Sequence, residues 1–357
     1  DVIGEVELAY LEAKSPFIAI TGTNGKTTTT ALIGQILRAY YESSFVVGNI
    51  GIPYTQMVTS TKSNSVTVAE ISSFQLETTR TFEPDVSLIL NITPDHLDRH
   101  HTMENYIDAK INITKNQLND KVCILNYEDA ELRKREKDIQ AKIVYFSSEH
   151  RLRGGIFLEN DTIIYNNGVE DITICNVKEL KLLGKHNYEN VMAAVMATIA
   201  IGVPLDVIIE EIKKFVSVEH RIEYVKEIHG VKYYNDSKGT NPDAAIKAVE
   251  AMVTPTLLIA GGYDKDSSYD EWIDSFNGKI KKLVLIGQTR DKIAKTARDK
   301  GFYEIEMADT LEEAVKICKT NAQKGDAILL SPACASWGMF KNYQQRGDMF
   351  KALVRGE

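Results

Sequence analysis

The sequence predicts an α/β fold with two domains, each built on a mostly parallel sheet. Short apolar runs alternate with amphipathic stretches of helix length from residue 17 onward, and strands that alternate with helices form parallel sheets covered on both faces. The 357 residues are about twice the length of one compact domain. We therefore expect a first domain over residues 1–217 and a second over residues 218–357.

Composition and charge exclude several classes of protein. With 43% apolar and 26% charged residues, the chain is neither disordered nor a coiled coil. A net charge of −8 argues against a surface that grips nucleic acid, although a local basic pocket stays possible. No apolar run approaches the roughly 20 residues that span a bilayer, and the four cysteines show no CxxC spacing. These features predict a reduced, cytoplasmic enzyme with no nucleic-acid or membrane partner.

The first domain is predicted to alternate strands and helices around a short β-rich stretch. Its expected strands, which are short and mostly apolar, are 17–21, 65–71, 86–92 and 121–125. Its expected helices are 27–40, 104–117, 187–200 and 205–215. Residues 150–180 are rich in turns, and Asn166, Asn167 and Gly168 mark a hairpin-like reversal. We expect this stretch to add a small antiparallel sheet to the domain.

The second domain repeats the alternation and is predicted to be a doubly wound, Rossmann-like unit. Its expected strands are 232–234, 256–260, 282–286, 303–307 and 327–330. Its expected helices are 242–252, 289–300 and 310–323, followed by a last helix that ends near Val354. Pro242 suits the first turn of its helix, where a missing N–H breaks no hydrogen bond.

A glycine loop between the first strand and the first helix predicts a nucleotide-phosphate site. The loop reads Gly22-Thr23-Asn24-Gly25-Lys26-Thr27-Thr28. Glycines let backbone N–H groups converge on an anion at the start of a helix, while Lys26 reaches the β- and γ-phosphates and the Thr27 hydroxyl holds Mg²⁺. Ile20 replaces the first glycine of the strict pattern, and the alternative is a chance Gly-Lys-Thr turn. The strand and the helix on either side favour a P-loop ATPase-type domain.

Polar residues near the carboxyl ends of the next strands are candidate ligands, because open α/β sheets bind ligands there. Glu70 ends a predicted strand, where it either binds Mg²⁺ or is an ordinary N-cap or solvated glutamate, and the residues alone leave these choices about even. Asp95 and His96 form a metal-binding pair or, more commonly, a capping turn. Lys110 is first interpreted as a solvated helix lysine, and Asn187 as a helix N-cap.

Glycine-containing or polar loops follow further strands of both domains. Residues 48–53 suit either a turn or the close approach of a substrate. In the second domain, residues 235–241, 261–265 and 331–336 carry Lys, Ser or Thr, which suit a carboxylate or phosphate ligand. Each loop alone is an ordinary turn, but their recurrence on one predicted sheet edge favours a site. Cys334 has no partner motif, so we expect a small buried residue and not a nucleophile.

Together these motifs make the chain resemble the Mur ligase family of peptidoglycan synthesis, and most closely its D-glutamate-adding branch. The string GTNGKT at 22–27 is shared with folylpolyglutamate synthetases and indicates only the superfamily. The strings NDSKGTN at 235–241 and SPACAS at 331–336, with FKNY at 340–343, are typical of the D-glutamate branch. The resemblance covers essentially the whole chain.

The resemblance implies roles for residues of the first domain. The ATP phosphates are implied to bind Gly22, Thr23, Asn24, Gly25, Lys26, Thr27 and Thr28, and the adenine to meet Asn187 and Asn190. The implied catalytic residues are Lys26, Glu70, His96 and Lys110. Two Mg²⁺ ions are implied to bind Thr27, Glu70, His96 and Lys110. Carbamylation by CO₂ would turn Lys110 from a cation into a carboxylate-like ligand.

The resemblance also implies contacts with the substrates. Asp236 is implied to meet the ribose of the nucleotide. The implied D-glutamate pocket consists of Lys238, Thr240, Lys265, Ser336 and Tyr343. The remaining implied substrate contacts are Asn49, Ser72 and Arg221. Phenylalanine is also familiar at the position of Tyr343, and we expect no loss of function from the tyrosine.

The implied activity is that of a monomeric, ATP-dependent ligase that joins D-glutamate to UDP-N-acetylmuramoyl-L-alanine through an acyl phosphate. A folylpolyglutamate synthetase-like ligase and an inactive ATP-binding module are the alternatives. The family also has an N-terminal domain for the UDP part, for which residues 1–16 are too few. We therefore expect a truncated chain that binds ATP but uses the UDP-linked acceptor poorly.

Overall fold

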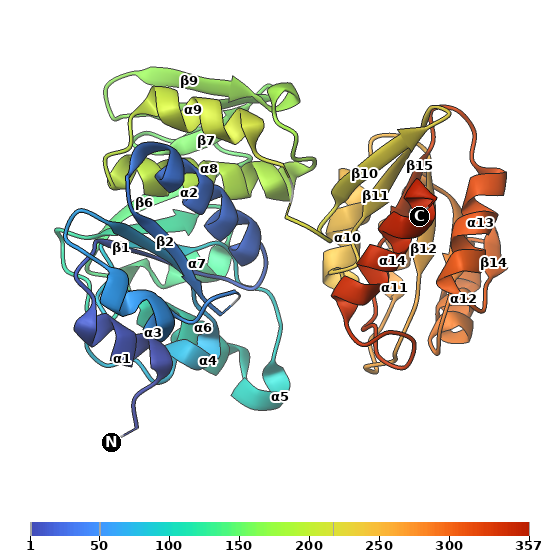
Figure 1. The fold of residues 1–357 in the computed structure, drawn as a ribbon, viewed down its shortest axis with the longest axis horizontal. Helices are drawn as coiled ribbons and strands as arrows, with labels where there is room; N and C mark the ends of the chain where they lie inside the picture. The colour runs from blue at the N-terminus through green and yellow to red at the C-terminus, as the bar shows by residue number, and fades with distance from the viewer. Residues whose placement is uncertain (1, 50, 217, 357) are drawn as a thin grey trace. The chain divides into compact units, whose positions relative to one another are not determined.

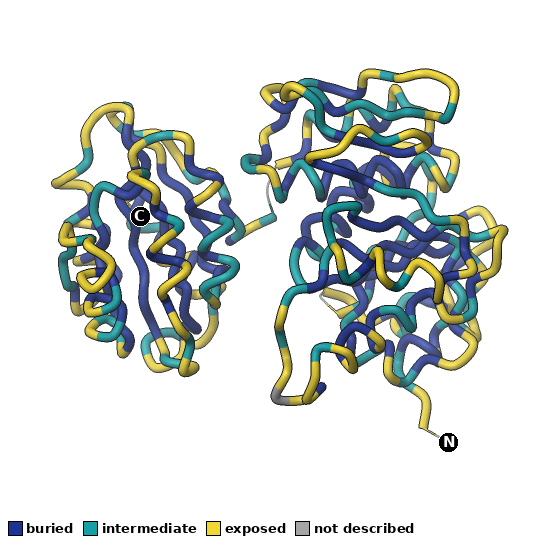
Figure 2. The backbone as a smooth tube through the Cα atoms, turned by 180° about the vertical axis from the view of Figure 1, so that it is seen from behind, coloured by how far each residue is buried: buried dark blue, intermediate teal, exposed yellow. Residues whose placement is uncertain are grey.

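The computed structural model of the chain describes residues 2–49, 51–216 and 218–356. These residues form two compact units, Asp1–Phe215 and Val216–Glu357. Each unit is one sheet covered by helices (Figure 1), and the central strands are buried (Figure 2). The α/β class predicted from the sequence is confirmed. The predicted boundary at residue 217 lies outside the described residues.

The first unit contains a nine-stranded sheet in the order β2-β3-β1-β4-β5-β6-β7-β8-β9. Pairing is parallel from β2 to β7 and antiparallel from β7 to β9. The strands are β1 (Phe17–Thr21), β2 (Ser44–Gly48), β3 (Val66–Glu70), β4 (Val86–Ile89), β5 (Val122–Asn126), β6 (Lys142–Ser147), β7 (Ile156–Glu159), β8 (Thr162–Asn166) and β9 (Asp171–Asn176). The predicted antiparallel addition is therefore present, and it continues the main sheet through the β6–β7 pair.

Helices cover both faces of this sheet. They are α1 (Glu5–Glu12), α2 (Lys26–Tyr40), α3 (Tyr54–Met57), α4 (Ser73–Leu76), α5 (Leu97–His100), α6 (Met103–Ile111), α7 (Ala130–Lys134), α8 (Lys185–Ala200) and α9 (Leu205–Lys214). One core joins α1, α3, α4, α6 and α7 to alternate strand residues such as Phe17, Ala19 and Ala69. On the other face α2 packs against β3 and α8, and α9 packs on α2. The predicted helix 104–117 ends early at Ile111, where the Thr114 hydroxyl bonds the Ile111 carbonyl in a short 3-10 turn.

The second unit contains a six-stranded sheet in the order β10-β11-β15-β12-β13-β14. Its strands are β10 (Glu223–Ile228), β11 (Val231–Asn235), β12 (Thr256–Ala260), β13 (Ile280–Leu285), β14 (Ile305–Met307) and β15 (Ala327–Leu330). Its helices are α10 (Pro242–Ala251), α11 (Asp270–Asp274), α12 (Arg290–Asp299), α13 (Leu311–Asn321) and α14 (Tyr343–Arg355). α13 and α14 share one core with the sheet, and α12 contacts β13 outside that core. All pairings are parallel except that of the edge strand β10, which the sequence analysis does not predict.

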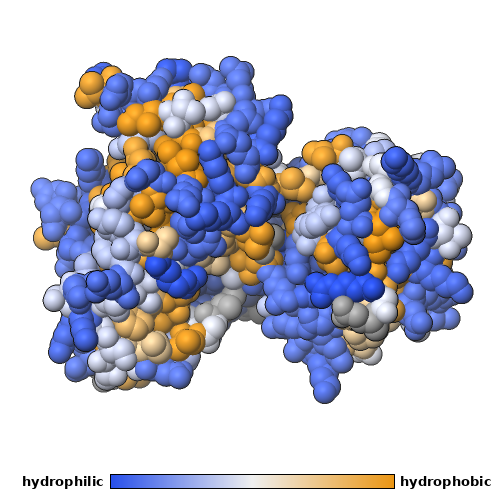
Figure 3. Space-filling model, turned by 45° about the horizontal axis from the view of Figure 1, so that its top comes forward, coloured by the Kyte–Doolittle hydropathy of each residue, from blue (hydrophilic) through white to orange (hydrophobic). Residues whose placement is uncertain are grey.

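The visible surface is mostly hydrophilic on the face drawn in Figure 3. Large apolar side chains that reach solvent include Val169, Val253 and Tyr303, which lie in separate loops. Among the described residues, no helix combines the length and the apolar character needed to cross a membrane.

Candidate active site

The glycine loop lies between β1 and α2, as the sequence predicts. Gly22 (φ +144°) and Gly25 (φ +88°) both adopt conformations that favour glycine. A Cβ on Gly25 would lie 2.2 Å from Asn190 Oδ1, and one on Gly22 would lie 3.2 Å from the Leu90 backbone nitrogen. Glycine is therefore required by both conformation and space at these two positions. Thr27 is partly exposed on the first turn of α2.

Two lysines converge on one carbonyl of this loop. Lys26 Nζ donates to the carbonyls of Gly22 (2.8 Å) and Thr23 (2.9 Å). Lys110 Nζ, on α6, donates to the same Gly22 carbonyl at 2.8 Å. Burial, with a smaller contribution from the neighbouring Lys26 charge, lowers the pKa of Lys110 to about 6. Lys110 is only 2% exposed, so its interpretation as a solvated helix lysine is wrong.

The segment after β4 clamps the glycine loop from the side. Asn91 Oδ1 accepts from the Asn24 backbone N–H at 2.8 Å, and Asn91 Nδ2 donates to the Asn24 carbonyl at 3.1 Å. The Thr23 hydroxyl accepts from the Thr93 backbone N–H at 3.0 Å, and it also lies 3.1 Å from Tyr106 Oη. No role was predicted for Asn91 and Thr93, although residues just after the end of a strand are candidates for a ligand site.

Glu70 ends β3 with a buried carboxylate, and only one of its two oxygens accepts a hydrogen bond from the described residues. Its Oε1 accepts from Asn49 Nδ2 at 3.1 Å. Its Oε2 is buried and has no hydrogen-bond partner among the described residues. Ser72, and not Glu70, caps the following helix α4, in a capping box with Gln75. The capping alternative for Glu70 is therefore wrong, and an orphaned carboxylate oxygen of this kind suits a hard cation.

His96 lies in the turn between β4 and α5, and its side chain is 50% exposed. Its Nε2 is 3.6 Å from Asp95 Oδ2, and its ring packs edge-on against Phe74 at 5.0 Å. Lys26 and Lys110 both bind the glycine loop. Among the described residues, the ion-pair contact of His96 is with Asp95 and not with either lysine.

The predicted adenine residues lie on α8, next to the glycine loop. Asn190 Oδ1 accepts from the Thr29 hydroxyl at 3.4 Å, and Asn190 Nδ2 donates to Asn187 Oδ1 at 3.3 Å. Both asparagines are buried. Asn187 does not cap α8, because Gly184 occupies that position and Asn187 Nδ2 donates to the Leu183 carbonyl at 2.7 Å. Thr28 is also buried, and its hydroxyl has no partner among the residues described.

In the second unit, the predicted D-glutamate residues lie on loops after β11, β12 and β15 and at the start of α14. They are Lys238, Thr240, Lys265, Ser336 and Tyr343. Lys238 Nζ lies 5.7 Å from the ring centroid of Tyr343, and Lys265 Nζ lies 5.2 Å from that of Trp337. Trp337 is a residue that the sequence analysis does not single out. The aromatic faces attract both ammonium groups.

A fully buried arginine ties two of these loops together. Arg346 Nε and one of its terminal nitrogens donate to the hydroxyl (2.9 Å) and carbonyl (2.8 Å) of Ser237. The other terminal nitrogen donates to the Cys334 carbonyl at 3.2 Å. Burial lowers the pKa of Arg346 to about 10, which still leaves the guanidinium charged at neutral pH. Cys334 is buried, as expected, and burial raises the pKa of its thiol.

Asp236 lies on the loop after β11, but its carboxylate points into the second unit. Its Oδ2 accepts from the Ser331 hydroxyl at 2.7 Å, and its Oδ1 accepts from the Ile222 backbone N–H at 3.2 Å. Burial raises the pKa of this carboxyl to about 7, and the nearby charge of Arg221 opposes the rise. Both oxygens of the predicted ribose contact are thus engaged within the protein.

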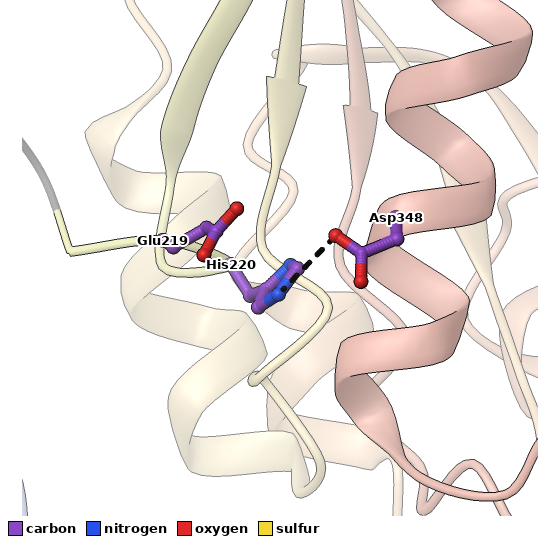
Figure 4. Close-up of side chains that lie close together, drawn as sticks. All are labelled: Glu219, His220 and Asp348. Atoms are coloured by element: carbon purple, nitrogen blue, oxygen red, sulfur yellow. Dashed lines mark ion pairs between the residues drawn. The ribbon is translucent and has the colours of Figure 1, made fainter. Parts of the chain in front are cut away.

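His220 and two acidic residues lie close together at the base of α14 (Figure 4). His220 Nε2 is 3.8 Å from Asp348 Oδ1, and Glu219 completes the group. Lys351 Nζ forms an ion pair with Glu219 and lies 3.3 Å from Asp348 Oδ1 and 3.6 Å from Glu223 Oε1. Because the lysine supplies the positive charge, this cluster is an ion-pair network and not a metal centre.

Two domain families match the chain, one in each unit. Residues 20–198 match the Mur ligase middle domain, and residues 220–334 match the glutamate ligase domain of Mur ligases. Similar relatives from Lachnoclostridium phytofermentans and Lachnospira eligens are named UDP-N-acetylmuramoylalanine--D-glutamate ligase. They are 61% and 59% identical over 353 residues, which cover 99% of this chain and 78% of each relative.

Solved Mur ligase structures share the fold. The MurF ligase from Thermotoga maritima in complex with ADP matches with a TM-score of 0.71 at 18% identity, over 99% of this chain and 84% of that chain. The MurC ligase from the same organism also matches with a TM-score of 0.71, at 19% identity, over 98% and 78% of the two chains. At these identities the likeness concerns the fold alone. With its two matched domains and its close relatives, the chain belongs to the Mur ligase family, among the UDP-N-acetylmuramoylalanine--D-glutamate ligases.

Proposed function

We propose that the chain is a monomeric, cytoplasmic, ATP-dependent ligase that joins D-glutamate to UDP-N-acetylmuramoyl-L-alanine. The observation that carries the proposal is the glycine loop after β1, whose Gly22 carbonyl accepts hydrogen bonds from both Lys26 and Lys110. Glycine loops at helix N-termini bind nucleotide phosphates. The names of the close relatives supply the two substrates.

The proposed reaction has two transfers and needs no protein nucleophile. A carboxylate oxygen of the L-alanyl group attacks the γ-phosphorus of ATP, the bond to the bridging oxygen breaks, and ADP leaves. The D-glutamate amine then attacks the acyl carbon and loses a proton, and phosphate leaves the tetrahedral intermediate to give the amide. Lys26 offsets phosphate charge, and the loops hold the reactants in place.

The proposed metal ligands are Thr27, Glu70, His96 and Lys110, for two Mg²⁺ ions. Mg²⁺, when bound, neutralises phosphate charge and orients the reacting oxygens. The orphaned Oε2 of Glu70 fits such an ion, because Mg²⁺ prefers carboxylate oxygens. Lys110 does not fit as an ammonium, because a cation repels the metal.

We propose that carbamylation resolves this conflict at Lys110. The amine is buried, and with its pKa lowered to about 6 it is largely neutral at pH 7. Its lone pair can then attack the carbon of CO₂, and one N–H proton leaves to solvent. The product carries two carboxylate-like oxygens in place of a positive charge, which suits a metal ligand.

The proposed binding sites divide between the two parts of the chain. Residues 1–217 would supply most of the ATP contacts, and residues 218–357 would bind D-glutamate. Nucleotide contacts are proposed for Gly22, Thr23, Asn24, Gly25, Lys26, Thr27, Thr28, Asn187, Asn190 and Asp236. Substrate contacts are proposed for Asn49, Ser72, Arg221, Lys238, Thr240, Lys265, Ser336 and Tyr343. The support is that most of them follow the carboxyl ends of strands, where ligands of open α/β sheets bind, while Asn190 on α8 contacts Thr29 beside the glycine loop.

An assay of ADP release tests the proposal. With the UDP-linked acceptor in large excess, because we expect the chain to use it poorly, release should depend on both D-glutamate and UDP-N-acetylmuramoyl-L-alanine, and folate substrates should not replace them. Lys26→Ala and Lys110→Ala should each abolish it, because one removes charge at the phosphates and the other a metal ligand. Lys115→Ala is the matched control for Lys110, because Lys115 is an exposed lysine just after the 3-10 turn that follows α6. Near-normal turnover in either active-site variant would contradict the assignment, and mass spectrometry should detect one added CO₂ only when Lys110 is present.

A further inference from the structure

The turn that presents His96 is strained at both ends. His96 (φ +52°) adopts the left-handed conformation, and His101 (φ +67°) also has a positive φ, which is uncommon for residues other than glycine. Such conformations persist only where surrounding contacts hold them, and they cluster at ligand sites. The turn 96–101 therefore needs an anchor in the rest of the first unit.

His100 is the buried residue of this turn, with a side chain that is 3% exposed. Its Nε2 lies 3.0 Å from Ser73 Oγ, and its Nδ1 lies 3.3 Å from Glu77 Oε1. The serine and the imidazole therefore share one hydrogen bond, and the Glu77 carboxylate lies within ion-pair distance on the other side of the ring. Ser73 opens α4 and Glu77 closes it, and α4 begins just after Glu70.

Ring and backbone contacts add to this anchor. The Phe74 ring stacks on His100, with centroids 5.3 Å apart and planes at 11°, and the same ring packs edge-on against His96. The His100 backbone N–H donates to the His96 carbonyl at 3.0 Å. Asn105 Nδ2, on α6, donates to the His100 carbonyl at 2.9 Å. His100 thus links the His96 turn to both α4 and α6.

Serine, histidine and glutamate in this order also form hydrolase triads. That role is excluded here, because Ser73 is 3% exposed and the whole His100 residue is 4% exposed, so no substrate reaches the hydroxyl. The three side chains instead connect two segments that each carry a proposed metal ligand, Glu70 before α4 and His96 at the turn.

We infer that His100 is a positioning residue: it fastens the turn 96–101 to α4 and so holds His96 in place relative to Glu70 for metal binding. The inference rests on the proposed function, because it requires His96 to be a ligand. Partners that orient metal ligands commonly affect metal affinity by 10- to 100-fold.

Binding of Mn²⁺ with ADP, followed by electron paramagnetic resonance, tests the inference directly. His100→Phe keeps a ring to stack on Phe74 but loses the hydrogen bond with Ser73 and the contact with Glu77, so we expect about tenfold weaker Mn²⁺ binding. Ser73→Ala removes the hydrogen bond alone and should weaken binding less. His100→Gln, whose amide oxygen can accept from the Ser73 hydroxyl, should restore part of the affinity.

Ser87→Ala is the matched control, because its hydroxyl is also buried and donates to Gln117 Oε1 at 2.6 Å, on β4 and away from the turn. It should lower the melting temperature as much as Ser73→Ala but leave Mn²⁺ affinity unchanged. If His100→Phe has a lower melting temperature but an unchanged Mn²⁺ affinity, the positioning role is overturned. A different result would contradict the proposed metal site itself: if His96→Ala binds Mn²⁺ as tightly as the wild type, His96 is not a ligand.

Discussion

Asp236 combines a predicted ligand contact with a buried carboxyl whose pKa is raised to about 7. In the unfolded chain this carboxyl ionises near its ordinary value of 3.8. Between these two values the folded state holds the extra proton, so the stability that Asp236 contributes is present below pH 3.8 and is lost as pH rises toward 7. The hydrogen bonds from Ser331 and Ile222 only partly offset the cost of burying the charge.

Asp236→Asn should remove this pH dependence. The amide keeps an acceptor oxygen and cannot ionise, so the variant should gain stability relative to the wild type by at most ~1.4 kcal/mol for each pH unit between pH 5 and 7. Urea unfolding followed by tryptophan fluorescence measures this, because Trp272 and Trp337, the two tryptophans of the chain, both lie in the second unit. Asp299→Asn, at an exposed position, is the control. A difference that stays constant with pH would refute the buried-charge argument.

Two buried basic residues, Lys110 and Arg346, show where residue-level reasoning from sequence stops. Lys110 sits on a helix whose local pattern is that of an ordinary surface lysine, and only the resemblance to a family singled it out. Its burial depends on Gly22, which is 88 residues away in the chain. Arg346 bonds to Ser237 across 109 residues. Contacts of this range leave no local signal, whereas Lys26 was predicted because its loop is contiguous in sequence.

At the scale of elements, α1 is fastened to the sheet by a carboxylate in a nest of backbone donors. Glu7 is 2% exposed and accepts from the backbone N–H groups of Arg80, Thr81 and Phe82 at 2.9, 2.8 and 3.1 Å, and from the Thr81 hydroxyl at 2.6 Å. Burial opposes ionisation, but these donors outweigh it and hold the pKa of Glu7 below its ordinary value of 4.5. This contribution to stability is present above pH 4.5 and is lost as pH falls through the lowered pKa.

Glu7→Gln should destabilise the first unit by ~1–3 kcal/mol at pH 7, because one buried acceptor becomes a donor that faces backbone N–H groups. The expected fall in melting temperature is ~2–4 °C for each kcal/mol. Calorimetry should find that the gap to the wild type narrows as the pH drops below 4.5. Glu12→Gln, at an exposed position on the same helix, should have no comparable effect. If the difference in melting temperature between Glu7→Gln and the wild type is the same at all pH values, the charge of Glu7 does not contribute to stability.

Buried parallel strands were the elements most predictable from sequence. β1 and β12 match their expected ranges because each is a short apolar run that is buried throughout. The edge strand β10 was missed because its residues Glu223–Ile228 alternate between partly buried and exposed, so its position rests on pairing with β11 and not on an apolar run. The start of α8 was predicted at Asn187, but the helix begins at Lys185. The Asn187 amide donates to the Leu183 carbonyl and so does not cap the helix.

For the whole molecule, each unit has a buried core of its own, with Phe17 and Tyr106 in one and Tyr233 and Phe350 in the other. Chains with separate cores often unfold in more than one step. The predicted division of ligands between the units can therefore be tested by which core a ligand stabilises. The positions of the glycine loop and of Glu70 were predictable because ligands gather at the carboxyl edge of open sheets, a rule that needs only the order of strands and loops.

Calorimetry should resolve two transitions, of which tryptophan fluorescence follows only the second unit. A nonhydrolysable ATP analogue with Mg²⁺, at about 100 times its Kd, should stabilise the first unit by ~2.7 kcal/mol. That corresponds to a rise of roughly 5–11 °C in the transition that fluorescence does not detect. Lys26→Ala should remove the rise. A shift confined to the transition that fluorescence detects would place the nucleotide in the second unit and contradict the proposed assignment.

The carbonyl that Lys26 and Lys110 share has a consequence for the chemistry of the surroundings. Protons and dissolved CO₂ compete for the same lone pair on Lys110, and burial of this amine, with a smaller contribution from the charge of Lys26, weakens its hold on a proton. Under the proposed carbamylation, each pH unit below about 6 shifts this competition tenfold toward the proton. The ligase would then respond to bicarbonate supply and acidity together, through one buried amine beside its phosphate loop.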